Sequence, residues 1–294
     1  MLEIKGLKKT YASGVQALKG IDLEVTAGVF GLLGPNGAGK STLMRILATL
    51  LEPDSGEVAV SGVDFINQKM AARRMLGYLP QEFGLYPTLT AEQTLAYFAR
   101  LKGVMDGKER ARLIDALLER VNLSNVRKQA VGGFSGGMRQ RLGIAQALIG
   151  QPRIIIVDEP TAGLDPEERN RFHNLLSEIA GEATVVLLST HIVSDVSTLC
   201  GQMSIIRRGE ILAFSTPQAA LAQIANVVWE AAVPREDVPA LKSRFRVLST
   251  RIFEGRVCVR VFSSGGRPAE GFSLATPTLE DYYLSLVSQP ESVN

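Results

Sequence analysis

The sequence has few cysteines and no long apolar run. Its only two cysteines, Cys200 and Cys258, are too far apart for a metal-binding or redox spacing, so we expect two buried thiols in a reducing compartment. Apolar runs such as IIIV and TVVLL are far shorter than the roughly 20 residues that a membrane-spanning helix needs. The first residues, MLEIKGLKKTY, lack the apolar core and cleavage site of a signal peptide. We therefore expect a soluble, cytoplasmic protein.

The sequence also has little net charge. Lysine and arginine number 32 against 30 acidic residues, a formal charge of +2. This balance gives no indication of a nucleic-acid partner, which would favour a strongly basic surface. The hydrophobic fraction of 46% is ordinary for a globular chain that buries a core.

The order of sequence patterns predicts two domains in the 294 residues. The runs IIIVDE and ATVVLLST are too continuously apolar to alternate, which is typical of parallel strands covered on both faces. Between about residues 86 and 150 the pattern becomes helical, beginning with a capping-box pair, Thr90 and Gln93. After Pro217, three strand-like and two helix-like stretches predict a small α+β domain. The expected domains are therefore residues 1–216 and 217–294.

The most specific motif is GPNGAGKST, which follows the strand-like run GVFGLL and precedes an apolar helical pattern. It fits the phosphate-binding pattern G-x-x-x-x-G-K-[ST], in which backbone N–H groups and a helix N-terminus face phosphate oxygens. Lys40 is expected to neutralise the β- and γ-phosphates, and Ser41 to bind Mg²⁺. A glycine-rich turn without a ligand is the alternative, but it needs four fixed positions to coincide by chance. The expected phosphate-binding residues are Gly34, Pro35, Asn36, Gly37, Ala38, Gly39, Lys40, Ser41 and Thr42.

Two adjacent acids end another strand-like run, IIIVDEP. Asp158 is expected to hold Mg²⁺ through its water shell, and Glu159 to polarise an attacking water. A carboxylate at a strand end is often only a cap or a solvated group. Two acids in succession after a fully apolar run, in a chain with a phosphate loop, favour the catalytic interpretation.

Between these motifs, GGFSGGMRQRLGIAQAL closely resembles the signature segment of ATP-binding cassette (ABC) ATPases, which typically reads LSGGQ. The resemblance covers residues 1 to about 216 and implies an α/β P-loop ABC cassette. Such a cassette has a mixed sheet core, an antiparallel β-subdomain and a helical subdomain. The resemblance also implies roles for four more residues: Gln81 as the Q-loop glutamine that senses Mg²⁺, Asp165 in the D-loop, His191 as the switch histidine at the γ-phosphate, and Tyr11 stacked on adenine.

Each of these four residues also has an ordinary structural interpretation. Tyr11 could be an exposed strand tyrosine, Gln81 a surface polar residue, and Asp165 only a helix cap. A lone histidine is more often structural than catalytic, and we expect this of His173, on a polar helix face. His191 differs from His173 because it ends an apolar strand-like run.

The signature segment also implies how copies of the chain associate. Its serine and glycines begin a helix and form a second anion site. One phosphate cannot use two distant glycine loops of one chain, so the resemblance implies a head-to-tail homodimer with each ATP between Lys40 of one chain and the signature segment of the other. Phe134 and Met138 replace the usual leucine and glutamine, but the serine and glycines are present, so we expect an active dimer. The residues expected at this second site are Ser135, Gly136 and Gly137.

Three functions are compatible with a P-loop ATPase. The chain lacks the tandem cassettes of ribosome-acting ABC proteins, the coiled-coil insertion of DNA-repair ABC proteins, and the [NT]-K-x-D motif of GTPases. LYPTLTAEQTLAYFARLKG and TPTLEDYYLSLV resemble the motor subunits of bacterial exporters. We therefore expect an ATP- and Mg²⁺-dependent motor that drives a separate transmembrane permease at the inner face of the membrane. The alternative is a soluble ABC ATPase acting on a non-membrane macromolecule.

The residues after Pro217 are predicted to regulate or dock rather than to catalyse, with Trp229 and Phe253 as core aromatics. The last helix carries an apolar stripe at helical spacing. This stripe either closes the core of its own small domain or packs against the same region of a second chain. The stripe residues are Leu279, Tyr282, Tyr283 and Leu286.

Overall fold

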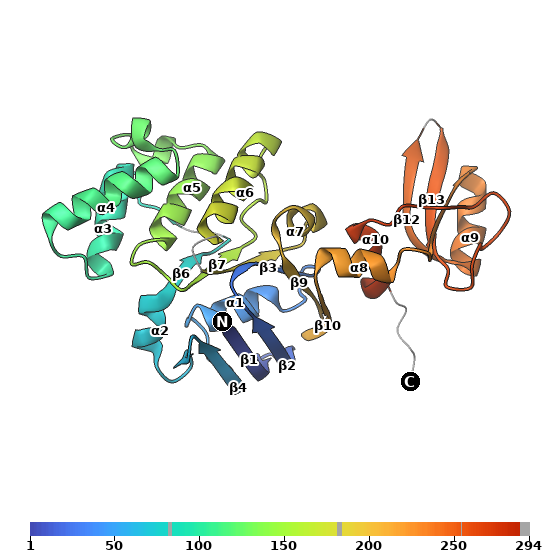
Figure 1. Cartoon of the computed structure of the whole chain (residues 1–294), viewed down its shortest axis with the longest axis horizontal. Coiled ribbons are helices and arrows are strands. Elements are labelled where there is room, and N and C mark those ends of the chain that lie inside the picture. Colours follow the sequence, from blue (N-terminus) through green and yellow to red (C-terminus); the bar gives the residue numbers. More distant parts are fainter. Residues whose placement is uncertain (82–83, 181–183, 254, 289–294) are drawn as a thin grey trace. The chain divides into compact units, whose positions relative to one another are not determined.

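The computed structural model describes residues 1–81, 84–180, 184–253 and 255–288. The chain forms two compact units, Met1–Ala213 and Phe214–Asn294 (Figure 1). A compact unit reflects packing and does not by itself demonstrate an independent domain, so the division into domains 1–216 and 217–294 stays a prediction. Within the described ranges, no helix is long and apolar enough to span a membrane.

The first unit contains two sheets. One is antiparallel, with the order β2-β1-β4-β5. The other has the order β10-β9-β3-β8-β7-β6, in which the five strands from β9 to β6 run parallel. Only Arg208 and Gly209 separate β9 from β10, a connection short enough to require an antiparallel pair and hence a mixed sheet. The strands are β1 (Leu2–Thr10), β2 (Gln16–Val25), β3 (Gly28–Leu33), β4 (Ser55–Val60), β5 (Val63–Asp64), β6 (Leu76–Leu79), β7 (Ile154–Asp158), β8 (Val185–Thr190), β9 (Gln202–Arg207) and β10 (Glu210–Ser215).

Helices cover both faces of the mixed sheet. The first helix, α1, packs between the two sheets through Leu43, Met44 and Leu47. On the other face, α6 and α7 pack against β3 and β8. Every residue of β7 and β8 is buried, as a parallel sheet covered on both faces requires. The helices of this unit are α1 (Lys40–Leu47), α2 (Lys69–Met75), α3 (Ala91–Leu101), α4 (Gly107–Arg120), α5 (Gly136–Ala147), α6 (Pro166–Ala180) and α7 (Val193–Leu199), with short 3₁₀ turns at Ser124–Val126 and Val131–Gly133.

The helical part of the unit, α3 to α5, begins with the predicted capping box. The Thr90 hydroxyl accepts from the Gln93 N–H at 3.2 Å, and the Gln93 side chain accepts from the Thr90 N–H at 2.9 Å. Such a cap stabilises a helix by about 0.5–2 kcal/mol. The apolar helical pattern after the phosphate loop forms α1, which stops at Leu47 before a turn. Sequence patterns missed α2, α7 and β10, which are short or lack a clear apolar period.

The second unit is the predicted α+β fold. Its antiparallel sheet has the order β12-β13-β11-β14. Alternate residues Val257, Val259 and Val261 form the core with Phe272, and Trp229 packs partly buried against it. The side chain of Phe253, also predicted for this core, lies outside the described residues. The elements are α8 (Pro217–Gln223), β11 (Val228–Val233), a 3₁₀ turn (Arg235–Asp237), α9 (Val238–Arg244), β12 (Arg246–Phe253), β13 (Arg256–Phe262), β14 (Ser273–Leu274) and α10 (Leu279–Val287).

The last helix, α10, packs against α8 and β12 of its own unit. Leu279 and Tyr282 are buried within the single chain, and Thr278 caps the helix. The Asp281 carboxylate accepts from the Arg260 guanidinium, which lies on β13, at 2.9 and 3.0 Å. Half of the apolar stripe is therefore used inside its own unit.

The two cysteines are not equivalent. Cys200 is buried, and burial raises its pKa to about 12. Cys258 is only half-buried, so the prediction of a second buried thiol is wrong. It lies on β13 on the face opposite the valine core, where cover is less complete.

Candidate functional site

The candidate site lies where the parallel strands of the mixed sheet end. The phosphate loop follows β3, Gln81 follows β6, the two acids end or follow β7, and His191 follows β8. Parallel strands bring their carboxyl ends to one edge of a sheet, and ligands bind at such edges in open α/β sheets. Segments far apart in the sequence thus reach one place.

The glycines of the phosphate loop are required by its backbone and by its neighbours. Gly37 and Gly39 have φ angles of 78° and 109°, in the left-handed region that favours glycine. A Cβ atom on Gly39 would lie 2.6 Å from the carbonyl oxygen of Ala17. A Cβ atom on Gly34 would overlap the carbonyl oxygen of Ile206. The motif is therefore tied to this tight turn between β3 and α1.

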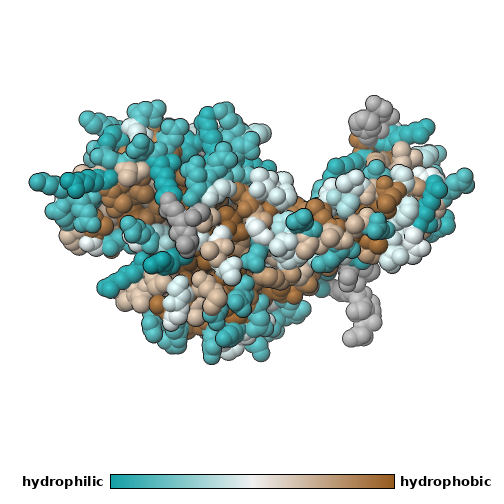
Figure 2. Space-filling view, in the orientation of Figure 1, coloured by the Kyte–Doolittle hydropathy of each residue, from teal (hydrophilic) through white to brown (hydrophobic). Residues whose placement is uncertain are grey.

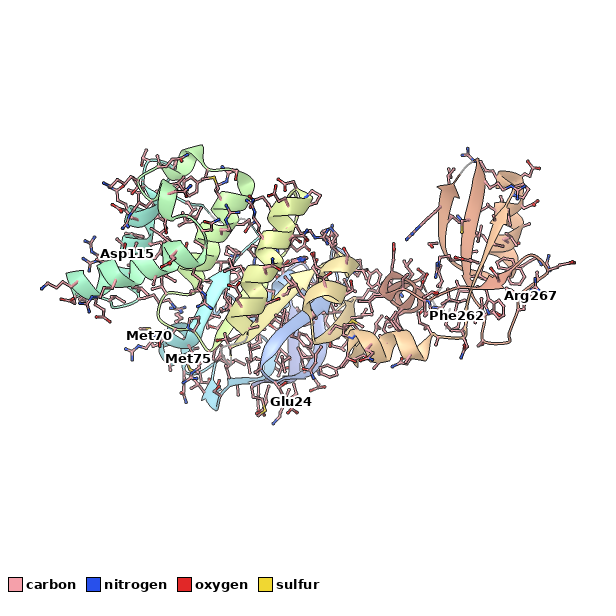
Figure 3. All side chains as sticks on the ribbon, turned by 45° about the horizontal axis from the view of Figure 1, so that its top comes forward. Glu24, Met70, Met75, Asp115, Phe262 and Arg267 are labelled. Carbon is pink, nitrogen blue, oxygen red and sulfur yellow. The ribbon has the colours of Figure 1, made fainter. Side chains whose placement is uncertain are left out.

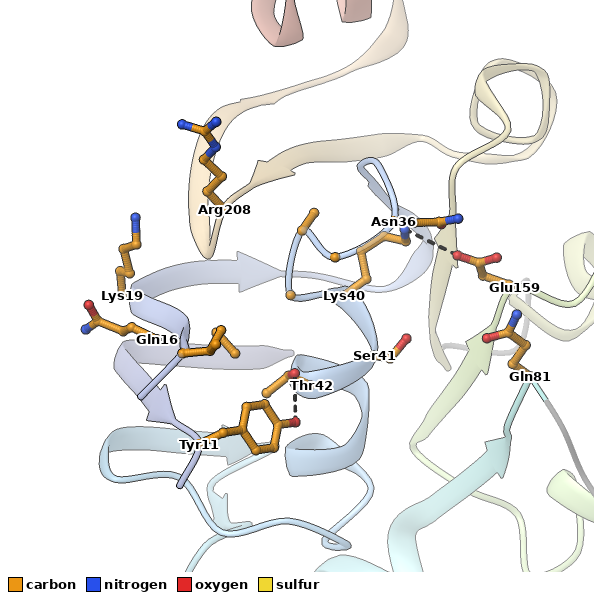
Figure 4. Close-up of a pocket in the computed structure, with 15 residues that line it drawn as sticks. Tyr11, Gln16, Lys19, Asn36, Lys40, Ser41, Thr42, Gln81, Glu159 and Arg208 are labelled. Carbon is orange, nitrogen blue, oxygen red and sulfur yellow. Dashed lines mark hydrogen bonds and ion pairs between the residues drawn. The ribbon is translucent and has the colours of Figure 1, made fainter. Parts of the chain in front are cut away.

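The loop forms one side of a cavity of about 660 Å³ (Figure 4). Tyr11 and Gln81, both predicted from the sequence, line the same cavity. Sequence reasoning missed Gln16, Lys19 and Arg208, because isolated polar residues in strands and turns carry no distinguishing pattern. The predicted residues that line the cavity are Tyr11, Asn36, Gly37, Ala38, Gly39, Lys40, Ser41, Thr42, Gln81 and Glu159.

The Lys40 ammonium group is held at the centre of the site. The residue is only 4% exposed, and Nζ donates to the carbonyl oxygens of Gly34 at 2.7 Å and Pro35 at 3.2 Å. Nζ also lies 3.3 Å from Oε1 of Glu159, which is 9% exposed (Figure 4). A buried cation and a buried carboxylate thus face each other in the cavity.

The two acids at the end of β7 have different surroundings. Asp158 is buried and accepts from the Ser189 hydroxyl of β8 at 2.5 Å. Burial raises the pKa of Asp158 above its usual value, and the neighbouring negative charge of Glu159 raises it further. The hydrogen bond from Ser189 and the positive charge of Lys40 lower the pKa, but by less. Asp158 is therefore a buried carboxylate held by a hydroxyl of the neighbouring strand β8.

The backbone at Glu159 leaves the extended conformation of β7, and the residue lines the cavity. Its φ of 48° lies in the left-handed region, and its N–H donates to the Ser189 carbonyl at 3.0 Å. Its Oε2 atom lies 3.0 Å from Nδ1 of His191, whose side chain is part-exposed. One carboxylate therefore contacts both Lys40 and His191, which lie far apart in the sequence.

Tyr11 and Gln81 lie at the outer parts of the cavity. The Tyr11 ring is part-exposed, and its hydroxyl lies 3.0 Å from the Thr42 hydroxyl. Gln81 is exposed and also lines a second, neighbouring hollow of about 590 Å³ together with Gly136 and Gly163. Tyr11 thus presents a ring face beside the phosphate loop, and Gln81 reaches two hollows.

The signature segment lies outside the main cavity. Ser135 caps α5, its hydroxyl accepting from the Met138 N–H at 3.1 Å. Gly136, the first residue of the helix, is exposed. Gly137 is buried, and a Cβ atom there would overlap the Glu168 carboxylate, which also pairs with Arg141. Within one chain, the described residues that line the phosphate-loop cavity do not include this segment.

Asp165 caps a helix as its structural interpretation predicts, whereas His173 does not lie on the predicted face of its helix. The Asp165 carboxylate accepts from the Glu168 N–H at 2.9 Å and so caps α6, as the sequence suggests. The placement of His173 on a polar helix face is wrong, because the residue is buried and its Nε2 lies 2.9 Å from Oδ1 of Asp195. Asp195 itself was missed, since a single acid in a short helix carries no motif.

Comparison with known proteins gives consistent matches over the chain. A family model described as ABC transporter matches residues 18–162. The daunorubicin resistance ATP-binding protein DrrA3 of Streptomyces coeruleorubidus is 35% identical, over 99% of this chain and 97% of its own length. The probable multidrug ABC transporter ATP-binding protein YbhF of Escherichia coli is 34% identical, over 98% of this chain and 52% of its own length. These matches extend through the second unit.

A solved structure matches the first unit. It is a dimeric structure of the ATP-binding cassette MJ0796 in a post-hydrolysis state with ADP and Pi. The TM-score is 0.67 at 28% identity, covering 74% of this chain and 98% of that one.

Proposed function

This chain belongs to the ABC transporter family of ATP-binding proteins, and from that premise we propose how its residues bind ATP, assemble and couple to transport. The protein is the ATP-hydrolysing motor of an ABC transporter. The observation that carries the residue assignment is the meeting of the phosphate loop, Lys40 and Glu159 in one cavity. Residues 1–216 act as the nucleotide-binding domain and 217–294 as an accessory domain.

ATP binds along the cavity from Tyr11 to Glu159. The Tyr11 ring stacks on the adenine, and the loop from Gly34 to Thr42 surrounds the phosphates with backbone N–H groups. Lys40, buried and aimed into the cavity, neutralises the β- and γ-phosphates. Phosphate binding requires Lys40 to exchange its contact with Glu159 for one with the nucleotide.

The residues near Lys40 suit Mg²⁺, which prefers oxygen ligands. Ser41 and Gln81 line the cavity with a hydroxyl and an amide oxygen, and Asp158 supplies a buried carboxylate at the end of β7. These three residues would hold the ion, which when bound neutralises charge on the phosphate oxygens. Asp158 is kept in place by Ser189 for this purpose.

Glu159 acts as the general base and His191 supports it. The Glu159 carboxylate accepts a proton from the attacking water, while His191, bonded to Oε2, keeps the carboxylate in place and reaches the γ-phosphate. A base must be within hydrogen-bond reach of its proton and held in a fixed orientation, and the contact with His191 supplies the orientation.

The active form is a head-to-tail dimer. A related cassette is described as dimeric with ADP and Pi bound, and the exposed start of α5 in this chain offers N–H groups to a phosphate. In the dimer, Ser135, Gly136 and Gly137 of one chain contact the ATP held by Lys40 of the other, with Asp165 at the interface.

The dimer is tested by mixing two inactive variants. Ser135→Arg removes one half of a site and Lys40→Ala the other, so a mixed dimer contains one complete site. Mixing should restore a substantial fraction of the ATPase rate, while either variant alone stays inactive. Mixed dimers that form, shown by two distinguishable tags, yet hydrolyse no ATP would contradict a shared site.

The motor drives a separate permease that exports drug-like compounds. Relatives are described as daunorubicin resistance and multidrug transporter ATP-binding proteins, and export of related compounds is our proposal for this chain at the inner face of the membrane. Leu50, Met70 and Leu101 are each more than 60% exposed and line a groove of about 780 Å³ between α2 and α3. Figure 3 labels Met70 on α2, and Figure 2 shows apolar side chains near α3 among hydrophilic surface.

This groove is the proposed contact with the permease. Met70→Glu and Leu101→Glu should reduce co-sedimentation of the chain with membranes and co-purification of an integral membrane protein identified by mass spectrometry. The ATPase rate of the isolated chain should be unchanged. Leu212→Glu, at an exposed apolar residue of β10, is the matched control. Unaltered membrane association in both groove variants, or co-purification of a non-membrane macromolecule instead, would favour the alternative function.

A further inference from the structure

Asp195 is a buried acid outside the motifs described above. It lies on α7, its side chain has no exposed surface, and it accepts hydrogen bonds from four side chains on three other segments. The donors and distances are Thr161 Oγ1 at 2.6 Å, Arg169 Nε at 2.7 Å, His173 Nε2 at 2.9 Å and Thr190 Oγ1 at 3.3 Å.

The donors lie in segments that carry the proposed catalytic and interface residues. Thr190 is the last residue of β8 and directly precedes His191. Thr161 lies between Glu159 and Asp165, in the connection from β7 to α6. One carboxylate therefore joins the segment of the switch histidine to the segment of the D-loop aspartate.

The hydrogen bonds around Asp195 form a buried network that favours the ionised carboxylate. Burial alone raises the pKa of a carboxyl group, but the bonds from His173, Thr161 and Arg169 outweigh this and hold the pKa of Asp195 below its usual value. Hydrogen bonds to charged groups are worth more than neutral ones, and a buried network of this kind holds its members in one geometry. Thr190 adds a second constraint, because its hydroxyl also accepts from the Ile192 N–H at 2.9 Å.

We propose that Asp195 is a positioning residue for ATP hydrolysis, which holds the end of β8 against the Thr161–Asp165 segment and so maintains the 3.0 Å contact between His191 and Glu159. This inference rests on the proposed roles of Glu159 and His191. Asp195 touches no nucleotide; it acts through the backbone of the two segments. Small displacements of positioned catalytic groups reduce rates strongly while leaving substrate binding largely intact.

The first test is Asp195→Asn, which keeps the shape of the side chain and removes its charge. We expect kcat to fall by ~10-fold or more, with KM for ATP changed by less than about 3-fold. Rates are expressed per nucleotide-binding site, titrated with a fluorescent ATP analogue, so that unfolded protein does not count. Asp281→Asn is the matched control, because Asp281 is an equally buried acid with an arginine partner in the other unit. It should lower the melting temperature and leave kcat per site unchanged.

A pair of variants at Thr161 tests the hydrogen bond from Thr161 to Asp195 without changing a charge. Thr161→Val removes the hydroxyl that donates to Asp195 and keeps the volume, and Thr161→Ser restores the hydroxyl. Valine should lower kcat per site several-fold and serine should return it to near the wild-type value. The inference is overturned if Asp195→Asn and Thr161→Val retain wild-type kcat per site, or if serine is as slow as valine.

Glu159→Gln and His191→Ala separate this inference from the function on which it rests. If these two variants hydrolyse ATP normally, the proposed function fails. If they are inactive while Asp195→Asn turns over like the wild type, only the positioning role fails.

Discussion

The exchange of Glu159 for glutamine separates ATP binding from ATP hydrolysis. Glutamine has the same length, and the contact with Ser189 is donated by the backbone N–H of residue 159, so this contact and the left-handed backbone should survive. What is lost is the negative charge that faces Lys40 at 3.3 Å and His191 at 3.0 Å. Hydrolysis should therefore fail while the fold and the phosphate loop remain.

Glu159→Gln should lower the turnover number and raise the affinity for ATP. Loss of a general base lowers turnover by roughly 10²- to 10⁴-fold, equivalent to about 3–5 kcal/mol of transition-state stabilisation. Binding should improve, because Lys40 no longer has to leave a carboxylate before it contacts phosphate. An interaction of this kind is worth on the order of 1 kcal/mol once desolvation is included, so ATP affinity should rise by about five-fold.

The assay measures phosphate release at saturating ATP and, separately, the Kd for ATP by equilibrium titration. Glu178→Gln, an exposed glutamate on α6, is the matched control and should change neither value. Glu159→Gln should also accumulate as an ATP-bound dimer in gel filtration, because the nucleotide persists. Wild-type turnover in this variant would refute the catalytic assignment, and a loss of ATP binding parallel to the loss of turnover would refute the proposed exchange at Lys40.

Three further predictions concern the same unit and the cysteines. Asp158→Asn should abolish turnover but raise the melting temperature at neutral pH. The pKa of Asp158 is raised in the folded protein, so its ionised form lowers the stability above that pKa. The difference in melting temperature between variant and wild type should shrink as the pH falls through the folded-state pKa. Gly34→Ala should lower the free energy of unfolding by about 1–3 kcal/mol in urea titrations and weaken ATP binding, because the new methyl group overlaps the Ile206 carbonyl. In the native protein at pH 8, a thiol reagent should modify Cys258 quickly and Cys200 only after unfolding.

The site residues with strong local signals were predictable from the sequence. Glycines at fixed spacing before Lys40 and two acids after an apolar strand each imply a local geometry, and the geometry was found. The order of the strands explains why these separate signals meet: all lie at the carboxyl ends of parallel strands. The roles of these residues in catalysis stay predictions.

The remaining features depend on tertiary contacts that no local pattern encodes. Asp195 accepts hydrogen bonds from Thr161, Arg169 and His173, which lie 22 to 34 residues away along the chain. The burial of His173 follows from the same network, because its ring faces a carboxylate rather than solvent. The short helix α7 carries Asp195 yet has only seven residues, too few for an apolar period to appear.

The structure narrows what the second unit can do. Leu279 and Tyr282 are buried against their own unit, so they are not free to pack on a second chain. The other two residues of the stripe, Tyr283 and Leu286, are half-buried. Two half-buried side chains offer much less apolar area than the roughly 800 Å² per partner of a stable interface. A dimer held by the second units would therefore need surfaces other than this stripe, whereas packing of α10 on α8 and β12 of its own unit already accounts for Leu279 and Tyr282.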